Sequence, residues 1–535
     1  MKKFLSILLA ALTALSLTGA PALAEGDASL VGGTLTVGMV GDPYALDSWT
    51  SNDMNASMLA NILRPALVVF DADANKVPYV LESWASNDDL TVWTAKIHDG
   101  LFWHDGEKFT ADDLAFTANY CATHSVNFGS DYYSMVKEAV ALDELTVQYT
   151  LNEPMVNFMT NMGFWVDVMP EHLMKDIEDL NNAEIPTVGF GPYKLTDYAK
   201  GEYYSFERVP DWALANDGVG AYVEHLVFRV YSDANALMLA IKSGEVDCSS
   251  SALPVAVQQQ LEAEGDLYGV EKVQSLGYGY FSFCYKNPLL ADPAVRKAIA
   301  QTVDRGALIA IGIQGGGVPM NTPISPVYTA LTEGAAEFPA FDIEAAKATL
   351  EAAGYTDKDG DGVRENANGD KLAFTLTCRN TTANIDAVAN IFKSNCEQAG
   401  IDITISLVEP ATYTDIVTKN KNYDINYIEW GVIDDPDMAL DAIYHSTCSL
   451  NFMCYQNEAI DAILEEVKTL PEAEARKAKM LEFQQLFVEE LPTINVLVRV
   501  NAYGYSKQRF EGFSATPGLY GILDVKDLVR VHEIK

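Results

Sequence analysis

The residues best suited to binding chemistry lie shortly before and within the stretch 426–457. Residues 423–430 (YDINYIEW) form a short β-rich run that ends in Trp430. Three aspartates follow it: Asp434, Asp435 and Asp437. Pro436 disfavours a helical conformation at the residue before it, which predicts that the carboxylates lie in a loop at a strand end. An aromatic ring beside several carboxylates could form a site for a small polar ligand, and the alternative is an acidic surface loop with a buried tryptophan.

Two cysteines come directly after this acidic loop. The chain has 7 cysteines, an odd number, so at least one is expected to stay free and buried. Cys448 and Cys454 are close enough in sequence to pair with each other. A bond between them would hold the loop that separates them.

Arg379 is a second candidate binding residue. It follows a predicted strand at 372–378 and precedes a predicted helix that begins near Ile385. A cationic side chain at the C-terminal end of a strand, beside a helix N-terminus, can hold a carboxylate. The alternative is an arginine paired with one of the many surface carboxylates. Tyr44 and Trp49 lie in the loop after the first predicted strand, at 33–40.

One segment has part of the spacing of a calcium-binding loop. Asp357, Asp359 and Asp361, followed by Gly362, occupy the first ligand positions of such a loop. Asn368 stands where a glutamate is required, so a Gly/Asp-rich turn is the alternative. No other metal site, and no cofactor, is predicted. The sequence contains no GxSxG, HExxH, phosphate-loop or CxxC motif, which argues against an enzyme.

The N-terminus and the net charge limit where the protein acts. Lys2 and Lys3, an apolar run at 4–17 and a small-residue cleavage site predict a signal peptide over residues 1–24. The first cysteine is Cys121, so no cysteine near the cleavage site could carry a lipid. We therefore expect export to a periplasm, or release from a one-membrane cell. The net charge of −39 argues against nucleic acid as a partner.

The remaining pattern predicts an α/β protein. Helices are predicted to begin after Thr110, Asp292 and Asp342, each of which is a good N-cap residue. Helix and strand patterns alternate over the second half of the chain. Such alternation predicts mixed or parallel sheets with helices on their faces.

Several stretches together resemble one protein family. They are LFWHDGEKFTADDLAFTAN (101–119), GFGPYKLTDYAKGEYYSFERVPDW (189–212), AIKSGEVD (240–247), DPAVRKAIAQTVDR (292–305) and FDIEAAKATLEAAGYTDKDGDGVRE (341–365). In this order they are similar to the extracytoplasmic solute-binding proteins of ABC transporters, family 5, the oligopeptide, dipeptide and nickel group.

The resemblance implies a two-lobed periplasmic-binding-protein fold of type II. The first lobe would comprise residues 27–275, with an inserted subdomain at about 64–187, and would be completed by residues 492–535. The second lobe would comprise residues 276–491. Two strands, near residues 280–285 and 492–500, would cross between the lobes.

The resemblance also implies a function and a set of site residues. In peptide-binding members an aspartate after the tryptophan holds the ligand's α-amino group; here Ile433 falls at that position, with Asp434 and Asp435 next to it. Arg379 would pair with the ligand carboxylate, Trp430, Trp49 and Tyr44 would line the cavity, and Cys448 and Cys454 would form a disulfide.

The protein would then be a monomeric, non-enzymatic component of an importer that delivers short peptides to a membrane permease. Three alternatives remain: another cargo, such as a metal chelate, an oligosaccharide or a cationic small molecule; a secreted hydrolase; and a calcium-dependent adhesion protein.

Overall fold

A computed structural model describes residues 26–51, 53–127 and 129–535. The predicted signal peptide, residues 1–24, lies outside the described residues. Within the described ranges, no helix has both the length and the apolar character needed to span a membrane.

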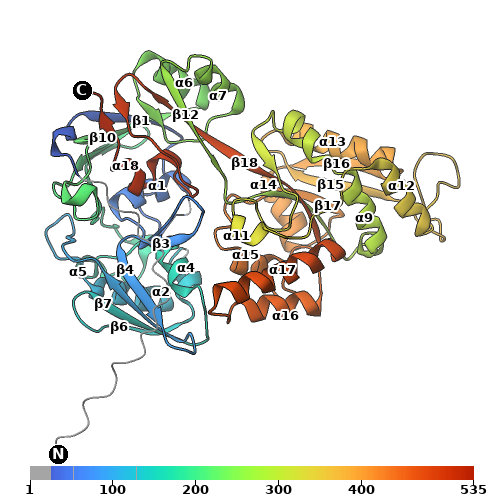
Figure 1. Ribbon diagram of the computed structural model, residues 1–535, viewed down its shortest axis with the longest axis horizontal. Coiled ribbons are helices and arrows are strands. Elements are labelled where there is room, and N and C mark those ends of the chain that lie inside the picture. Colours follow the sequence, from blue (N-terminus) through green and yellow to red (C-terminus); the bar gives the residue numbers. More distant parts are fainter. Residues whose placement is uncertain (1–25, 52, 128) are drawn as a thin grey trace, which may run out of the picture.

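Two mixed sheets, one in each lobe, are joined through the long strand β18 (Thr493–Ser506). The strand order within the described residues is β16-β15-β17-β13-β18-β11-β1-β10-β9-β8, with β12 and β14 also pairing to β18. β18 runs from one lobe to the other in Figure 1. The first half of β18 pairs with the second lobe, through β13 and β14, and its last residues pair with β12 of the first lobe.

The first lobe contains the sheet around β1, in which β1 is parallel to β10 and β11 and β10 is antiparallel to β9. A separate antiparallel sheet, β4-β5-β7-β6, lies beside it at the lower left of Figure 1. The strands are β1 (Thr34–Val40), β8 (Tyr193–Ala199), β9 (Tyr203–Arg208), β10 (His225–Tyr231), β11 (Cys248–Ser249), β12 (Tyr268–Gln274), β4 (Leu81–Ser86), β5 (Val92–Ile97), β6 (Val136–Ala141) and β7 (Thr146–Leu151), with the short pairs β2 (Val68–Phe70) and β3 (Lys76–Pro78), and β19 (Phe510–Glu511) and β20 (His532–Glu533).

The second lobe is built on parallel strands. β15 pairs in parallel with both β16 and β17, and β13 pairs antiparallel with β17 and β18. The strands are β13 (Gly279–Phe283), β14 (Gly317–Pro319), β15 (Ala373–Arg379), β16 (Asp402–Val408) and β17 (Ile425–Glu429). Helices pack around this sheet in Figure 1, so the predicted α/β class with mixed, helix-flanked sheets is confirmed.

Two segments of the chain join the strands of the two sheets. The chain passes between the lobes after β12 ends at Gln274 and before β13 begins at Gly279, so residues 280–285 lie within or beyond a second-lobe strand. The other crossing, near residues 492–500, coincides with β18. A strand that pairs continuously through two sheets looks locally like any other strand, so the periodicity of the sequence could not locate the junction.

Local capping chemistry places the helix starts as predicted. The capping box of α2 is present, and the Asp113 carboxylate accepts the Thr110 N–H at 3.0 Å. Asp292 caps α9 and Asp342 caps α12 through bonds of 2.9 Å. The main helices are α1 (Met54–Leu63), α2 (Ala111–Thr123), α3 (Gly129–Tyr133), α4 (Phe158–Trp165), α5 (Glu171–Met174), α6 (Ala234–Ser243), α7 (Val255–Glu262), α9 (Pro293–Thr302), α12 (Ile343–Ala352), α13 (Ile385–Gln398), α14 (Pro410–Tyr413), α15 (Pro436–Tyr444), α16 (Glu458–Val467) and α17 (Ala473–Glu490).

Each lobe has its own large hydrophobic core, and the two cores approach each other at one place. Phe70 and Ala74, from the first lobe, belong to the cluster of the second lobe. Phe164 of α4 packs against both clusters. The lobes therefore contact each other along β2, β3 and α4.

A buried histidine in the first lobe makes stability depend on pH. His104 donates its Nε2–H to the Gly191 carbonyl at 3.1 Å, and the Gly189 N–H donates to Nδ1 at 3.3 Å. Burial lowers the pKa of His104 from 6.5 to about 4, because it penalises the charged ring by more than the bond to the Gly191 carbonyl favours it. The unfolded chain binds a proton near pH 6.5, whereas the folded chain does not. The contribution of His104 to the free energy of unfolding is therefore fully present above pH 6.5. It is lost as the pH falls toward 4, by up to about 3 kcal/mol.

Urea unfolding at several pH values tests this expectation. His104→Gln keeps an N–H donor but does not titrate, so its stability should fall less steeply between pH 6.5 and pH 4. Equal slopes in the variant and the wild type would show that other groups dominate the acid response.

Candidate functional site

The segment from Trp430 to Pro436 lies where the two lobes meet. The carboxyl ends of the parallel strands β15 and β17 lie at the same edge of the second-lobe sheet, and Trp430 directly follows β17. The Trp430 Nε1–H donates to Tyr280 Oη at 2.9 Å, and its backbone N–H bonds to Tyr278 O. These bonds hold the tryptophan beside the chain that crosses between the lobes.

Close backbone packing and a buried tyrosine hold this segment in place. A Cβ atom at Gly277, between β12 and β13, would lie 1.9 Å from Trp430 O, so only glycine fits there. Tyr328 Oη donates to Ile433 O at 2.6 Å. Burial, together with the nearby Asp434 and Asp435 carboxylates, raises the pKa of Tyr328 well above its ordinary value. The hydroxyl therefore stays protonated and remains a donor.

Asp434 reaches across to the first lobe. Its Oδ2 lies 2.6 Å from Lys76 Nζ, and the Trp165 Nε1–H donates to the same oxygen at 2.8 Å. Only 5% of the Lys76 side chain and 12% of the Asp434 side chain are exposed. Lys76 Nζ also donates to Asn161 Oδ1 at 2.8 Å and lies over the rings of Phe70 and Phe164. The Asp434 charge is thus neutralised inside the protein by a lysine of the other lobe.

Asp435 also contacts the first lobe. It is the N-cap residue of α15, but its side chain does not cap the helix. Its Oδ2 instead accepts the Asn157 Nδ2–H at 2.7 Å, and the neighbouring Val156 N–H bonds to Lys468 O at 3.1 Å. Asn157 Oδ1 is buried and has no partner among the described residues. These contacts and the Lys76–Asp434 pair form the interlobe contact.

Arg379 and Trp430 share one hydrophobic surface of the second lobe. The Arg379 guanidinium carbon lies 4.6 Å from the centre of the Tyr413 ring, and Trp430 packs against the cluster that contains Tyr413. Arg379 Nε is buried without a partner among the described residues. Arg379 Nε is therefore not paired with a surface carboxylate, which was the alternative, and it remains available as a donor.

A second arginine, which the sequence pattern did not indicate, pairs with a carboxylate at the same sheet edge. Arg499 of β18 contacts Glu429 of β17 through Nε at 2.5 Å and Nη2 at 2.8 Å. Burial works against the charged guanidinium, but the bonds to Glu429 outweigh it and raise the pKa of Arg499. This bidentate pair ties β17 to the strand that joins the lobes.

The two aromatic residues after β1 are placed very differently. Tyr44 is 82% exposed. Trp49 is only 2% exposed and belongs to the first-lobe core. Its Nε1–H donates to Asp167 O at 2.9 Å, and the Arg64 guanidinium lies 4.5 Å from its ring centre. The contacts of Trp49 are those of a core residue.

The predicted Cys448–Cys454 disulfide is contradicted. Both residues are free thiols, as are the other five cysteines. Cys448 Sγ lies 3.8 Å from Asp441 Oδ2, whereas Cys454 Sγ lies 4.0 Å from Phe452 O. Cys454 also has a positive φ of 56°. The sulfurs have separate partners, and a disulfide requires a specific mutual geometry that a short sequence separation does not ensure.

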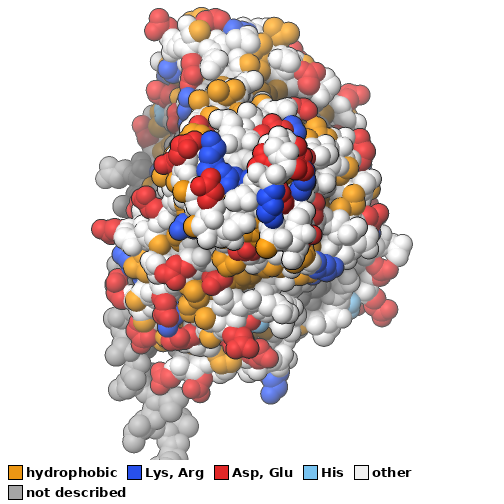
Figure 2. Space-filling view, turned by 90° about the vertical axis from the view of Figure 1, so that its right-hand side faces the viewer, with side chains coloured by type: hydrophobic (Ala, Val, Ile, Leu, Met, Phe, Trp, Pro, Cys, Tyr) orange, Lys and Arg blue, Asp and Glu red, His pale blue; other side chains and the backbone are white. Residues whose placement is uncertain are grey.

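The candidate calcium loop has internal partners. Lys371 Nζ bonds to Asp359 at 2.7 Å and Asp361 at 2.5 Å. The Asp357 carboxylate accepts the backbone N–H groups of Gly360 and Gly362. This loop follows α12 at the right-hand end of Figure 1, and Figure 2, which faces that end, shows basic and acidic side chains side by side. The Lys371 ammonium group therefore already neutralises two of the carboxylates that would bind a calcium ion.

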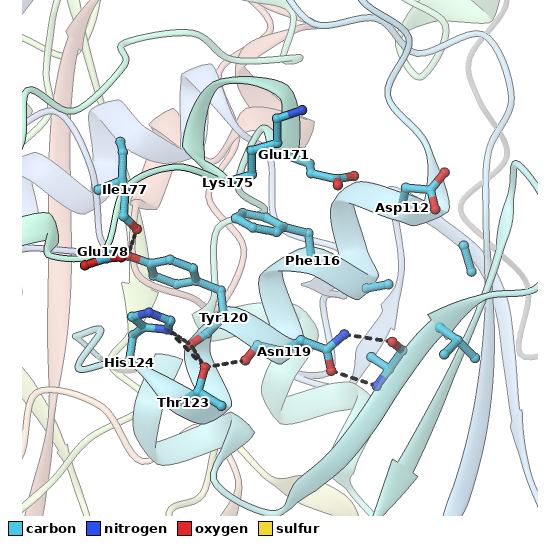
Figure 3. A pocket seen from close by; sticks show the side chains of 14 residues that line it. Asp112, Phe116, Asn119, Tyr120, Thr123, His124, Glu171, Lys175, Ile177 and Glu178 are labelled. Carbon is cyan, nitrogen blue, oxygen red and sulfur yellow. Dashed lines mark hydrogen bonds between the residues drawn. The ribbon is translucent and has the colours of Figure 1, made fainter.

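A separate cavity of about 560 Å³ lies on the outer side of α2 (Figure 3). It is lined from α2, β6 and the region after α5, and its polar groups bond to one another: Tyr120 Oη donates to Ile177 O, and Asn119 bonds to the backbone of Ala139. None of the predicted site residues lines it. The interlobe contact remains the better candidate.

Known proteins are similar to this chain in both sequence and fold. The pattern described as "Bacterial extracellular solute-binding proteins, family 5 Middle" matches residues 75–451. The oligopeptide-binding protein AppA of Bacillus subtilis is 26% identical over 92% of this chain and 91% of its own length. The glutathione-binding protein GsiB of Pectobacterium atrosepticum is 24% identical over 59% of each chain.

Solved structures agree on the fold. The structure of Bacillus subtilis AppA with a nonapeptide has a TM-score of 0.72 at 24% identity, and covers 94% of this chain and 99% of its own. The substrate-binding protein CtaP of Listeria monocytogenes has a TM-score of 0.81 at 21% identity, and covers 94% and 100%. From the family match and this shared fold, we conclude that the chain belongs to the bacterial extracellular solute-binding proteins of family 5.

Proposed function

We propose that the protein is the extracytoplasmic substrate-binding component of an ABC importer, that it captures short peptides between its lobes, and that it delivers them to a membrane permease. The observation that carries this proposal is the relationship to an oligopeptide-binding protein along 92% of the chain. The family to which the chain belongs binds extracellular solutes. We further propose that the protein is exported, acts as a monomer and has no enzymatic activity.

We propose the lobe boundaries that the resemblance implies. We propose residues 27–275 and 492–535 for the first lobe, with the β4–β7 sheet as part of an inserted subdomain at about 64–187, and residues 276–491 for the second. The lobes would close over the ligand by rotating about the chain between β12 and β13 and about β18. A ligand that contacts both lobes stabilises the closed form, because only the closed form makes all the contacts.

We assign ligand contacts to the predicted site residues and to one residue of the interlobe contact, Asn157. Arg379, with its unpartnered Nε, would hold a carboxylate. Trp430 would supply an apolar face, and Asp434 and Asp435 would supply negative charge near an ammonium. Tyr44 adds an exposed ring in the loop after β1. Asn157 Oδ1 is a further free acceptor on the first-lobe side.

One observation favours a second candidate, the same role with a non-peptide cargo. The Asp434 carboxylate is already paired with the Lys76 ammonium at 2.6 Å. A peptide amino group would have to displace or share this partner, whereas a ligand without an ammonium would not. The alternative cargoes are a metal chelate, an oligosaccharide or another small molecule.

Mass spectrometry of the molecules released when the purified protein is denatured distinguishes these cargoes. Protein prepared from cells grown in rich medium should release a set of short peptides, whose lengths would define the preference. Isothermal titration with the recovered peptides should then show binding of one peptide per chain. Release of a single non-peptide species would contradict peptide capture and support the second candidate.

A further inference from the structure

A compact group of metal-ligating side chains lies at the C-terminal end of α15, apart from the proposed ligand contacts. Asp441, His445 and Cys448 present ligand atoms that all lie within 4.8 Å of one another. Asp441 is 8% exposed and His445 is 9% exposed. Two of these three groups are therefore largely buried, whereas the aspartates of the 357–361 loop are exposed.

Local structure accounts for this convergence. Asp441 and His445 are four residues apart, so they share one face of α15. The helix ends at Tyr444, and the turn that follows is closed by the Cys448 N–H, which bonds to His445 O at 3.1 Å. This turn brings the Cys448 thiol back toward the helix face.

Asp441 and Cys448 each have a ligating atom available, and His445 would exchange the Thr447 contacts at its Nδ1 for the metal. Asp441 Oδ2 is paired with Lys468 Nζ at 2.7 Å, but Oδ1 is buried and has no partner among the described residues. A buried carboxylate oxygen without a partner is costly, which indicates that something is missing from the site. The Cys448 Sγ lies 3.8 Å from Oδ2 of the same carboxylate.

The bonds of His445 define its tautomer. The Thr447 N–H points at Nδ1 from 3.3 Å, so Nδ1 carries the lone pair and Nε2 carries the proton. Nε2 lies 3.3 Å from Glu465 Oε1. A carboxylate that accepts the far N–H of a histidine is the usual support of a metal-bound imidazole.

We propose that Asp441 Oδ1, His445 Nδ1 and Cys448 Sγ bind a divalent transition-metal ion such as Zn²⁺, with Glu465 orienting the imidazole. A carboxylate, an imidazole and a thiolate suit zinc and its neighbours better than calcium or magnesium. Water would complete the tetrahedron. Because the thiolate is the ligating form of cysteine, metal binding would release the Cys448 thiol proton to solvent.

The neighbouring lysine can accommodate the ion. The Lys468 side chain is 28% exposed, so its ammonium can turn to solvent when the metal neutralises Asp441. The Lys468 carbonyl also accepts the Val156 N–H from the first lobe. The metal would fix the end of α15 to the turn that carries Cys448 and, through Glu465, to α16. This role does not depend on which cargo is bound.

Cobalt titration of the full chain tests the site. Cys454→Ser serves as the parent variant, because Cys454 is the other partly exposed thiol among the described residues and could bind Co²⁺ by itself. Addition of Co²⁺ should produce a thiolate-to-cobalt charge-transfer absorption that saturates at one ion per chain, and Zn²⁺ should abolish it by displacement.

Matched variants in the same parent background assign the ligands. Cys448→Ser should lose the charge-transfer band, His445→Asn should weaken Co²⁺ binding at least tenfold, and Glu465→Gln should weaken it by about 10-fold to 100-fold. Asp357→Asn, which changes the exposed loop, should leave the band unchanged. Thermal unfolding without metal shows whether each variant is folded. Absence of a band in the parent variant, or a band that survives Cys448→Ser, would overturn the proposal.

Discussion

Replacing Lys76 by methionine is expected to shift the ligand-free lobes toward the open form on the order of a hundredfold. The closed form would bury the Asp434 carboxylate with no cation beside it, and breaking such a pair from one side costs about 3 kcal/mol or more. Methionine has a side chain of similar length, so it can fill the space beside the rings of Phe70 and Phe164, over which the Lys76 ammonium lies, without the charge. Small-angle scattering of ligand-free protein should show a larger radius of gyration than wild type. Calorimetry should show weaker binding of a recovered ligand that has no ammonium group, whereas a peptide whose ammonium replaces Lys76 beside Asp434 should bind at least as tightly as to wild type.

Lys96→Met is the matched control. Lys96 Nζ lies 2.6 Å from Glu82, the same distance as in the Lys76–Asp434 pair, but both side chains are nearly half exposed. An exposed pair contributes at most about 1 kcal/mol, so this variant should behave like wild type. The double variant Lys76→Met, Asp434→Asn removes both charges and should recover part of the closure. Unchanged scattering and affinity in Lys76→Met would show that the pair does not contribute to closure.

Replacing Trp49 by alanine is expected to destabilise the first lobe by about 3–5 kcal/mol. The change removes a fully packed ring, leaves Asp167 O without its donor and exposes the Arg64 guanidinium to a cavity. Urea unfolding, followed by a first-lobe signal, measures the loss.

Tyr44→Ala provides the comparison for Trp49→Ala. Tyr44 is 82% exposed, so the free energy of unfolding of Tyr44→Ala should differ from wild type by less than about 0.5 kcal/mol. If Trp49 only supports packing, folded Trp49→Ala should bind the recovered ligand with wild-type affinity. A loss of affinity without a loss of stability would return Trp49 to the binding surface, as the resemblance implies.

The local elements were predictable because short-range interactions define them. The capping box at Thr110, the N-caps at Asp292 and Asp342 and the left-handed glycine that ends α6 each depend on bonds within a few residues. The alternation of strands and helices in the second half of the chain likewise predicted a mixed, helix-flanked sheet. The resemblance then added the two-lobed arrangement, which periodicity alone could not supply.

The site was only partly predictable from the sequence. Trp430 and Asp434 could be identified as candidates because an aromatic ring and carboxylates follow a strand. Their partners could not be identified, since Trp165 lies 269 residues from Asp434 and no local pattern sets Lys76 apart from other lysines.

The sequence by itself therefore determined the family, the fold class and the segment at which ligand contacts are proposed. Only the tertiary structure decided that Trp49 is a core residue, that Cys448 and Cys454 have different partners and that the Asp434 charge is already paired. The physical reason is the same in each case. Burial and ion pairing depend on which distant segments meet, and long-range packing, rather than the neighbouring residues in the chain, decides that.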